Sequence, residues 1–360
     1  MTSSTNSLVL VSGASGFLGC HVVQQLLSAG YRVRGTVRSL SNEDKVRPIR
    51  QLCPEADKLE LVEADLLKAD TWPAAMKGCE FVVHTASPFP SASPRDESEL
   101  IRPAVDGTLN VLKAVAAEST VKRVVLTSSV AAIYYGHATY DKAYNEESWS
   151  NIDGPDVGAY EKSKTLAERA AWDFLKQRKD DTNKFELVTI CPSFIVGPML
   201  HKTECTSATV IRRVLMRDMP MVPRLQLGMV DVRDVALAHV RAVTAPAAAN
   251  QRILVSEKGM WFKDMALCLA KEFNSKGYSV PTKEAPYALL WLSSIFDKSI
   301  KMILPAVGRE VRLDNRKVRE LLSMDGLRPS EQSVVDMAYS LIQNGLVPKS
   351  KKLLAMEQKE

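Results

Sequence analysis

The stretch Ser12-Gly13-Ala14-Ser15-Gly16-Phe17-Leu18-Gly19 follows a short apolar run, Leu8–Val11, and opens a segment of helical periodicity that extends to Gly30. Glycines at this spacing allow a tight turn, a close approach of the backbone to a pyrophosphate, and close packing of the helix on the strand. The N-terminus of such a helix also offers free N–H groups and a partial positive charge to an anion. The stretch therefore predicts a phosphate-binding strand–turn–helix unit, with an ordinary glycine-rich turn as the alternative.

The rest of the first half alternates short apolar runs with amphipathic segments. This alternation is typical of a parallel sheet covered by helices on both faces. Right-handed crossovers then give a doubly wound α/β (Rossmann) fold. The expected strands are Leu8–Val11, Arg32–Val37, Leu59–Glu63, Phe81–Thr85, Val121–Thr127 and Phe185–Cys191. The expected helices are 16–30, one that ends near Cys53, Trp72–Lys77, Ala104–Glu118 and Ala159–Arg178.

After Gly197 the regular alternation of strand and helix signals ends, and proline-flanked segments appear. A length of 360 residues also fits two domains of roughly 150 residues each. We expect residues 1–195 to form the dinucleotide-binding domain, and residues 229–243 to return to its sheet as a strand and a helix. Residues 196–345 are expected to form a smaller substrate-binding lobe, and residues 346–360 a frayed polar tail.

Composition narrows the class of protein. The chain is 46% hydrophobic and 25% charged, as in ordinary globular proteins. Its net charge of +5 comes without the dense basic blocks of a nucleic-acid-binding protein, and no apolar run reaches the roughly 18 residues of a membrane span. The six cysteines are scattered, and Met1–Ser7 does not look like a signal peptide. We therefore expect a cytoplasmic protein with reduced thiols and no metal site.

The end of the second expected strand indicates which dinucleotide is bound. An acidic residue there would bind the ribose 2′-hydroxyl of NAD, but this chain has Gly35-Thr36-Val37-Arg38. Arg38 offers a planar fork for a 2′-phosphate, and Lys45 can add a second positive charge. NADP(H) is therefore favoured. The alternative is that both are solvated surface charges.

Two further strand ends carry candidate cofactor contacts. Asp65 can accept a hydrogen bond from the adenine amino group while Leu66 packs on the ring, although Asp65 is equally well placed to cap a helix. Thr85-Ala86-Ser87-Pro88 follows the fourth strand. Its small side chains let the ribose and phosphates lie against the backbone.

A candidate catalytic set follows later in the chain. Tyr160 and Lys164 are four residues apart near the start of the long helix, so both project from one helical face. Ser128 and Ser129 end the fifth strand, beside the cofactor crevice of such a sheet. Serine can bind a substrate carbonyl, tyrosine can donate the proton, and a nearby lysine ammonium lowers the phenol pKa. A tyrosine–lysine pair at this spacing also arises by chance, so the order of the motifs carries the argument.

Taken together, these motifs resemble the extended short-chain dehydrogenase/reductases of the NAD-dependent epimerase/dehydratase family. Within them, the chain is similar to the group of dihydroflavonol 4-reductase, cinnamoyl-CoA reductase and yeast methylglyoxal reductase over roughly residues 8–345. The matching residues are Ser12–Gly19, Thr36-Val37-Arg38, His84-Thr85-Ala86-Ser87-Pro88, Thr127-Ser128-Ser129, Glu147-Ser148-Trp149, Ala159–Trp172, Cys191-Pro192-Ser193, Val196-Gly197-Pro198 and Val230–Ala236. The loop after Ala131 does not match the plant flavonoid enzymes.

The resemblance implies that Ser129, Tyr160 and Lys164 are catalytic and that Ser128 lines the cofactor. It also places Pro192 and Val196 near the nicotinamide, and Ser207 near the adenosine phosphates. Motifs and resemblance together give these expected cofactor-binding residues: Gly13, Ser15, Gly16, Phe17, Leu18, Gly19, Arg38, Lys45, Asp65, Leu66, Thr85, Ala86, Ser87, Ser128, Tyr160, Lys164, Pro192, Val196 and Ser207.

The sequence thus predicts an NADPH-dependent reductase that converts an aldehyde or ketone to an alcohol. Its expected partner is a small carbonyl compound, and it is expected to be a monomer or homodimer. Three alternatives stay open: a hydroxysteroid dehydrogenase or sugar-nucleotide epimerase on the same fold, a non-catalytic NADP(H)-binding regulator, and a scaffolding protein. The missing acid after the second strand counts against an epimerase, the intact Ser/Tyr/Lys set against a regulator, and the glycine loop against a scaffold.

Overall fold

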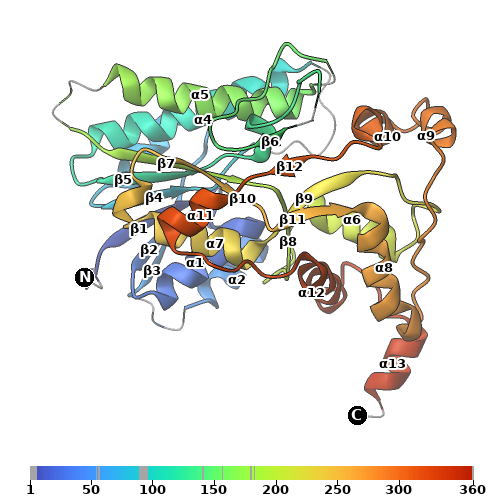
Figure 1. Cartoon of the computed structure of the whole chain (residues 1–360). Coiled ribbons are helices and arrows are strands. Elements are labelled where there is room, and N and C mark those ends of the chain that lie inside the picture. The colour runs from blue at the N-terminus through green and yellow to red at the C-terminus, as the bar shows by residue number, and fades with distance from the viewer. Residues whose placement is uncertain are drawn as a thin grey trace.

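The chain folds around a seven-stranded parallel sheet with helices on both faces (Figure 1). This computed structural model describes residues 6–53, 55, 57–88, 96–139, 142–155, 157–178, 181 and 183–358. The strand order is β10-β7-β5-β4-β1-β2-β3, and all neighbouring strands are parallel. The strands are β1 (Leu8–Ser12), β2 (Arg32–Val37), β3 (Leu59–Glu63), β4 (Phe81–His84), β5 (Arg123–Thr127), β7 (Glu186–Pro192) and β10 (Arg252–Val255). The predicted doubly wound fold is confirmed.

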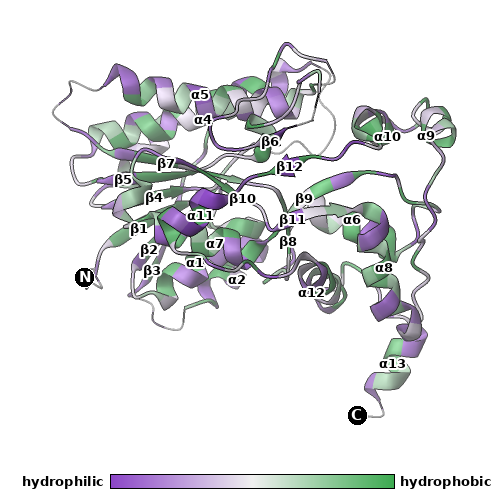
Figure 2. Cartoon of the chain, in the orientation of Figure 1, coloured by the Kyte–Doolittle hydropathy of each residue, from purple (hydrophilic) through white to green (hydrophobic). Residues whose placement is uncertain are grey.

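Strand residues alternate between two apolar layers. In β1, Val9 and Val11 face one core, whereas Leu10 faces the other, and all three are fully buried. A strand covered on both faces needs apolar side chains on both, which explains the continuous apolar runs of the sequence. Figure 2 shows apolar residues gathered on the central strands and on the inner faces of the helices.

The two helical layers come from different parts of the chain. One face carries α1 (Phe17–Ser28), α2 (Glu43–Arg50) and α7 (Val232–Ala242), whose buried residues share a core with Val9 and Val11. The other carries α3 (Trp72–Met76), α4 (Ser98–Ala117) and α5 (Ala159–Gln177) (Figure 1). From β1 the chain builds outward to β3 and then resumes on the other side at β4. The carboxyl ends of β1 and β4 therefore border the crevice where ligands bind in such sheets.

A second lobe follows β7. It contains a small sheet of β8 (Phe194–Val196), β9 (Gln226–Asp231) and β11 (Lys258–Trp261) in the order β11-β9-β8. A pair of short strands, β6 (Ala143–Tyr144) and β12 (Arg312–Leu313), joins a loop before α5 to a late part of the chain. The helices of this part are α6 (Thr206–Leu215), α8 (Phe262–Phe273), α9 (Tyr287–Ser293), α10 (Lys298–Ile303), α11 (Arg316–Leu322) and α12 (Ser330–Gln343). None of the helices in the described ranges is both long and apolar enough to span a bilayer.

The structure corrects two expectations about the second half. The strand within residues 229–243 does not join the main sheet, because β9 pairs with β8 and β11; the seventh strand of the main sheet is β10. The expected tail is also partly ordered, since Lys351–Glu357 form helix α13. The Ser350 hydroxyl accepts a hydrogen bond from the Leu353 N–H and donates one to the Lys276 carbonyl, which ties α13 to the 3-10 turn Asn274–Lys276 that follows α8.

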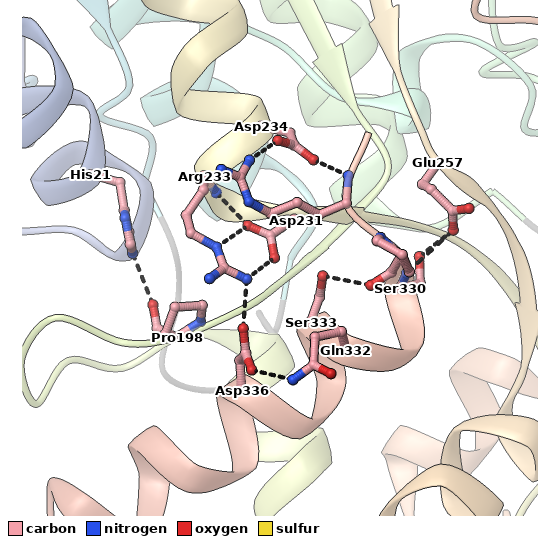
Figure 3. A network of polar contacts seen from close by, with 12 residues as sticks. His21, Pro198, Asp231, Arg233, Asp234, Glu257, Ser330, Gln332, Ser333 and Asp336 are labelled. Carbon is pink, nitrogen blue, oxygen red and sulfur yellow. Dashed lines mark hydrogen bonds and ion pairs between the residues drawn. The ribbon is translucent and has the colours of Figure 1, made fainter. Parts of the chain in front are cut away.

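A polar network joins α7 to α12 (Figure 3). The buried Asp231 carboxylate caps α7 by accepting the Arg233 N–H at 2.7 Å, and it also accepts two hydrogen bonds from the Arg233 guanidinium, at 2.9 and 2.7 Å. The guanidinium also contacts Asp336 of α12 at 2.6 Å. Asp234 binds the backbone N–H and the side chain of Arg328. These ion pairs hold the second lobe against the helical layer of the main sheet.

Candidate active site

The glycine loop has the geometry of a phosphate cradle. Gly13 has a φ of +68°, which favours glycine, and a Cβ added there would lie 3.0 Å from the Cα of Ala86. A Cβ added at Gly19 would lie 2.1 Å from the Gly13 carbonyl oxygen. Both positions therefore require glycine, one so that the loop can approach the end of β4 and the other so that α1 can pack on β1.

The N-terminus of α1 opens towards this loop. Its N-cap residue, Gly16, provides no side-chain cap, so the first N–H groups can bind an anion. The side chains of Phe17 and Leu18 are buried in the main core, so they anchor the helix while their backbone faces the loop. The Ser15 carbonyl contacts the Thr203 hydroxyl at 3.5 Å. This loop fits the pyrophosphate of a dinucleotide.

Positive charge lies beside the loop. Arg38 follows β2, is exposed, and forms no ion pair within the described ranges. The Lys45 ammonium lies 3.4 Å from the Thr203 hydroxyl, which in turn contacts Ser15 of the loop. Lys45 thus lies near the loop, and binding of a ribose 2′-phosphate by Arg38 and Lys45 stays a prediction.

Asp65 and Leu66, the two residues expected at the adenine, have different surroundings: Asp65 lies in a turn, and Leu66 lines a pocket. The Asp65 carboxylate accepts the Leu67 N–H at 3.0 Å within a turn, and it does not cap a helix, because the next helical turn, Ala69–Thr71, has Lys68 as its N-cap. Leu66 lies against α4 at Gly107, where an added Cβ would be 3.1 Å from the Leu66 Cβ. Leu66 also lines the pocket at the carboxyl edge of the sheet.

The end of β4 is tied to the end of β1. The Thr85 hydroxyl donates to the Ser12 carbonyl at 2.6 Å, and the Ala86 N–H donates to the Ser12 hydroxyl at 3.1 Å. His84 pairs with Ser12 at 2.6 Å, and burial lowers its pKa to about 3. This histidine is therefore a neutral core residue, and the loop after β4 is held in place next to Gly13.

A small pocket, partly open to solvent, lies at this edge. It brings together residues from four separate parts of the chain that the sequence had singled out. They are Leu66, Ala86, Ser87, Ser128 and Lys164, and Glu168 lies beside them.

Of the expected catalytic residues, Lys164 lines this pocket, and Ser129 follows Ser128, which also lines it. The Ser129 hydroxyl lies near enough to the Tyr160 phenol to oppose the rise of its pKa, and it accepts the Ala131 N–H at 3.1 Å. The Lys164 ammonium donates to the Ser87 hydroxyl at 3.0 Å and lies 6.0 Å from the centre of the Tyr160 ring. A serine, a tyrosine and a lysine thus converge from β5 and α5, beside the loop after β4.

Burial shifts the pKa values of Tyr160 and Lys164 in opposite directions. Burial raises the pKa of Tyr160 above its usual value of 10.0; the hydrogen bond from Ser129 opposes this shift, and Lys164 is not among its causes. Burial lowers the pKa of Lys164 to about 8. Burial is the largest cause of the Tyr160 shift, and a lowering of the phenol pKa by Lys164 stays a prediction.

The remaining predicted residues are spread around the cleft. The Ser128 hydroxyl donates to Glu168 at 2.6 Å. Pro192 ends β7, and Val196 is fully buried in the main core. Ser207 is buried near the start of α6, with its hydroxyl 3.5 Å from the Cys205 sulfur. Contacts of these four residues with a cofactor stay predictions.

Sequence reasoning missed Glu168 and Arg252. Glu168 is 1% exposed and binds Arg252 at 2.7 Å, although the two lie 84 residues apart. Glu168 follows Lys164 by four positions, so the helical period that linked Tyr160 to Lys164 also points to it. Nothing local marks Arg252, because its partner comes from another element.

The fold and site define a dinucleotide-binding protein with a Ser/Tyr/Lys set beside the phosphate loop. A family model described as "NAD dependent epimerase/dehydratase family" matches residues 9–255. The chain belongs to this family.

Individual relatives agree with this assignment. Cinnamoyl-CoA reductase CAD2 from Medicago truncatula is 38% identical over 260 residues, covering 71% of this chain and 77% of that protein. The NADPH-dependent methylglyoxal reductase GRE2 of Saccharomyces cerevisiae is 35% identical over 287 residues, covering 74% and 82%. The solved structure of yeast methylglyoxal/isovaleraldehyde reductase Gre2 complexed with NADPH superposes with a TM-score of 0.77 at 30% identity, covering 93% of this chain and 98% of that one.

Proposed function

We propose that this protein is an NADPH-dependent reductase of small aldehydes or ketones in which Tyr160 donates the proton to the carbonyl oxygen. The observation that carries the proposal is the convergence of Ser129, Tyr160 and Lys164 beside the phosphate loop.

The enzyme class and cofactor also rest on the relatives. The related proteins are reductases, one named NADPH-dependent and one solved with NADPH. They confirm the prediction of an NADP-dependent carbonyl reductase.

Each residue of the set has its own role in the proposed reaction. When bound, the cofactor supplies the hydride. Ser129 holds the substrate oxygen by a hydrogen bond, and Tyr160, kept protonated by its buried setting, gives its proton to that oxygen. Lys164 compensates the negative charge that develops on the phenol oxygen and is placed to bind the nicotinamide ribose.

The alternatives make different demands on the site. An epimerase returns the hydride to its substrate and retains NAD, whereas this chain has an exposed Arg38 and a half-buried Lys45 where an acidic residue would bind the NAD ribose. A non-catalytic regulator has no need of an intact Ser129, Tyr160 and Lys164 set. A hydroxysteroid dehydrogenase would share the whole site and differ in the substrate lobe.

The test is a substrate screen with the purified protein. NADPH oxidation is followed by absorbance with a panel of aliphatic and aromatic aldehydes, dicarbonyls, ketones and ketosteroids. Reduction of a small carbonyl supports the proposal, selective reduction of ketosteroids supports the dehydrogenase alternative, and NADPH binding without turnover of any of them contradicts it.

We further propose that the protein works in the cytosol. Its six cysteines are free thiols, as in proteins of reducing compartments. The division near residue 195 into a cofactor-binding and a substrate-binding part, and a monomeric or homodimeric state, stay predictions that limited proteolysis and light scattering can check.

A further inference from the structure

The buried Glu168 carboxylate is the centre of a polar network below the proposed catalytic residues. Its Oε1 accepts hydrogen bonds from the Thr189 hydroxyl at 2.8 Å, the Trp172 indole at 3.2 Å and Arg252 Nε at 2.7 Å. Its Oε2 accepts the Ser128 hydroxyl at 2.6 Å and Arg252 Nη2 at 3.2 Å. Burying a carboxylate this deeply costs free energy of folding unless hydrogen-bond donors and a positive charge compensate it. Here both oxygens accept hydrogen bonds, and Arg252 supplies the positive charge.

Arg252 extends the network from Glu168 to backbone carbonyls of the chain between β5 and α5. Its Nη1 donates to the carbonyls of Glu146 and Ser148, at 2.5 and 2.7 Å, and its Nη2 reaches the Ala132 carbonyl at 3.4 Å. The guanidinium also lies 3.7 Å from the centre of the Trp149 ring. Such a planar fork fixes directions that a lysine would leave free.

These contacts hold the catalytic serine from both sides. Ser128 immediately precedes Ser129, and Val130–Ala132 form a short 3-10 turn after it, capped by the Ser129 hydroxyl. Glu168 binds the chain before Ser129 at Ser128, and Arg252 binds it after Ser129 at Ala132.

The same carboxylate lies on the catalytic helix. Glu168 follows Lys164 by four residues and Tyr160 by eight, on one face of α5. One side chain therefore connects the helix that carries Tyr160 to the loop that carries Ser129.

We propose that Glu168, acting through Ser128 and Arg252, is a positioning residue that holds the Ser129 hydroxyl against Tyr160. This inference rests on the proposed roles of Ser129 and Tyr160. It also reassigns Ser128, whose hydroxyl serves Glu168 instead of the cofactor.

The test separates positioning from folding and from cofactor binding. Ser128→Ala removes the link to the serine loop and leaves the Glu168–Arg252 pair intact. We expect kcat for any carbonyl that the wild type reduces to fall about 10-fold, on the scale of small misplacements of reacting groups. The Kd for NADPH should stay unchanged, and Ser128→Thr should restore kcat because it restores the hydroxyl. Thr189→Val removes another Glu168 donor of similar size, and it should leave kcat unchanged.

A double-mutant cycle gives the decisive readout. If Ser128 acts only through Ser129, Ser128→Ala should lower kcat in the wild type but not in a Ser129→Ala background. If the Glu168→Gln variant folds, it should also lower kcat in the wild type but not in the Ser129→Ala background. If that variant does not fold, Ser128→Ala still tests the inference. Additive losses, or a weakened NADPH Kd in Ser128→Ala, would overturn the inference. Wild-type turnover in Ser129→Ala would instead overturn the proposed catalytic role of Ser129, so the two failures can be told apart.

Discussion

The Lys164 ammonium donates a hydrogen bond of 3.0 Å to the Ser87 hydroxyl and lies 6.0 Å from the centre of the Tyr160 ring. It thus connects the catalytic helix to the loop after β4, where the cofactor ribose is expected. Because burial lowers the pKa of Lys164 to about 8, its charge is present below that pH and lost above it.

This pKa gives a prediction for the pH profile. In the wild type, kcat/KM for NADPH should be flat on the acid side of pH 8 and fall above it, as Lys164 loses its proton. Lys164→Arg stays charged because the arginine pKa is about 12.5 or higher, so the fall near pH 8 should disappear. Lys164→Met should be slow at all pH values and lack the same fall. A fall near pH 8 that persists in both variants would assign it to another group.

Tyr160→Phe tests the proton donor. The change removes one hydroxyl and little volume, so the fold and NADPH binding should survive. Turnover should fall by roughly 10²-fold or more, the usual scale for a positioned acid. Steady-state kinetics and an NADPH titration by fluorescence measure the two quantities on the same sample. Near wild-type turnover would show that the Tyr160–Lys164 pair is a chance match.

Arg38→Ala tests cofactor selectivity. Loss of a charge-assisted hydrogen bond of about 1.5–3 kcal/mol should weaken NADPH binding by roughly 10- to 100-fold. NADH binding should barely change, because NADH has no 2′-phosphate. Parallel titrations with both cofactors provide the comparison, and equal weakening of both would remove the assignment of Arg38.

Asp231→Asn tests the network between α7 and α12. Asparagine can still cap the helix, but the carboxylate that pairs with Arg233 is lost. We expect unfolding to become easier by roughly 1–3 kcal/mol at neutral pH, measured by urea denaturation.

The acid dependence of this effect has a defined sign. Despite its burial, the pKa of Asp231 is lowered below 3.8 by its bonds to Arg233. Its contribution is therefore present above about pH 4 and lost as the pH falls through the folded-state pKa. The stability gap between wild type and Asp231→Asn should narrow in acid; a gap that stays constant would rule out the ion pair as its source.

The cysteines give a prediction about redox state. All six are free, and burial raises the pKa of Cys20 to about 12 and of Cys79 to about 11. Thermal midpoints with and without reductant should therefore agree. A large fall on reduction would reveal a disulfide that neither sequence nor structure indicates.

Much of the molecule follows from patterns within a few residues. The buried strands show as apolar runs such as Leu8–Val11, and Gly13 and Gly19 mark the loop because a turn and a helix contact leave no room for a Cβ. Tyr160 and Lys164 share a face because the helical period is local. These features depend on near neighbours, so the sequence alone determined them.

Other features depend on residues that are distant in sequence. Met229 lies in β9, and whether this strand joins the main sheet or the small one depends on which strands are available to pair with it. In the structure, β9 pairs with β8 and β11. Glu168 finds Arg252 only after α5 packs on the sheet. The pKa of Tyr160 is raised because tertiary packing removes water from the phenol. Strand pairing, buried charge and desolvation are set by long-range contacts, which is why only the tertiary structure decided them.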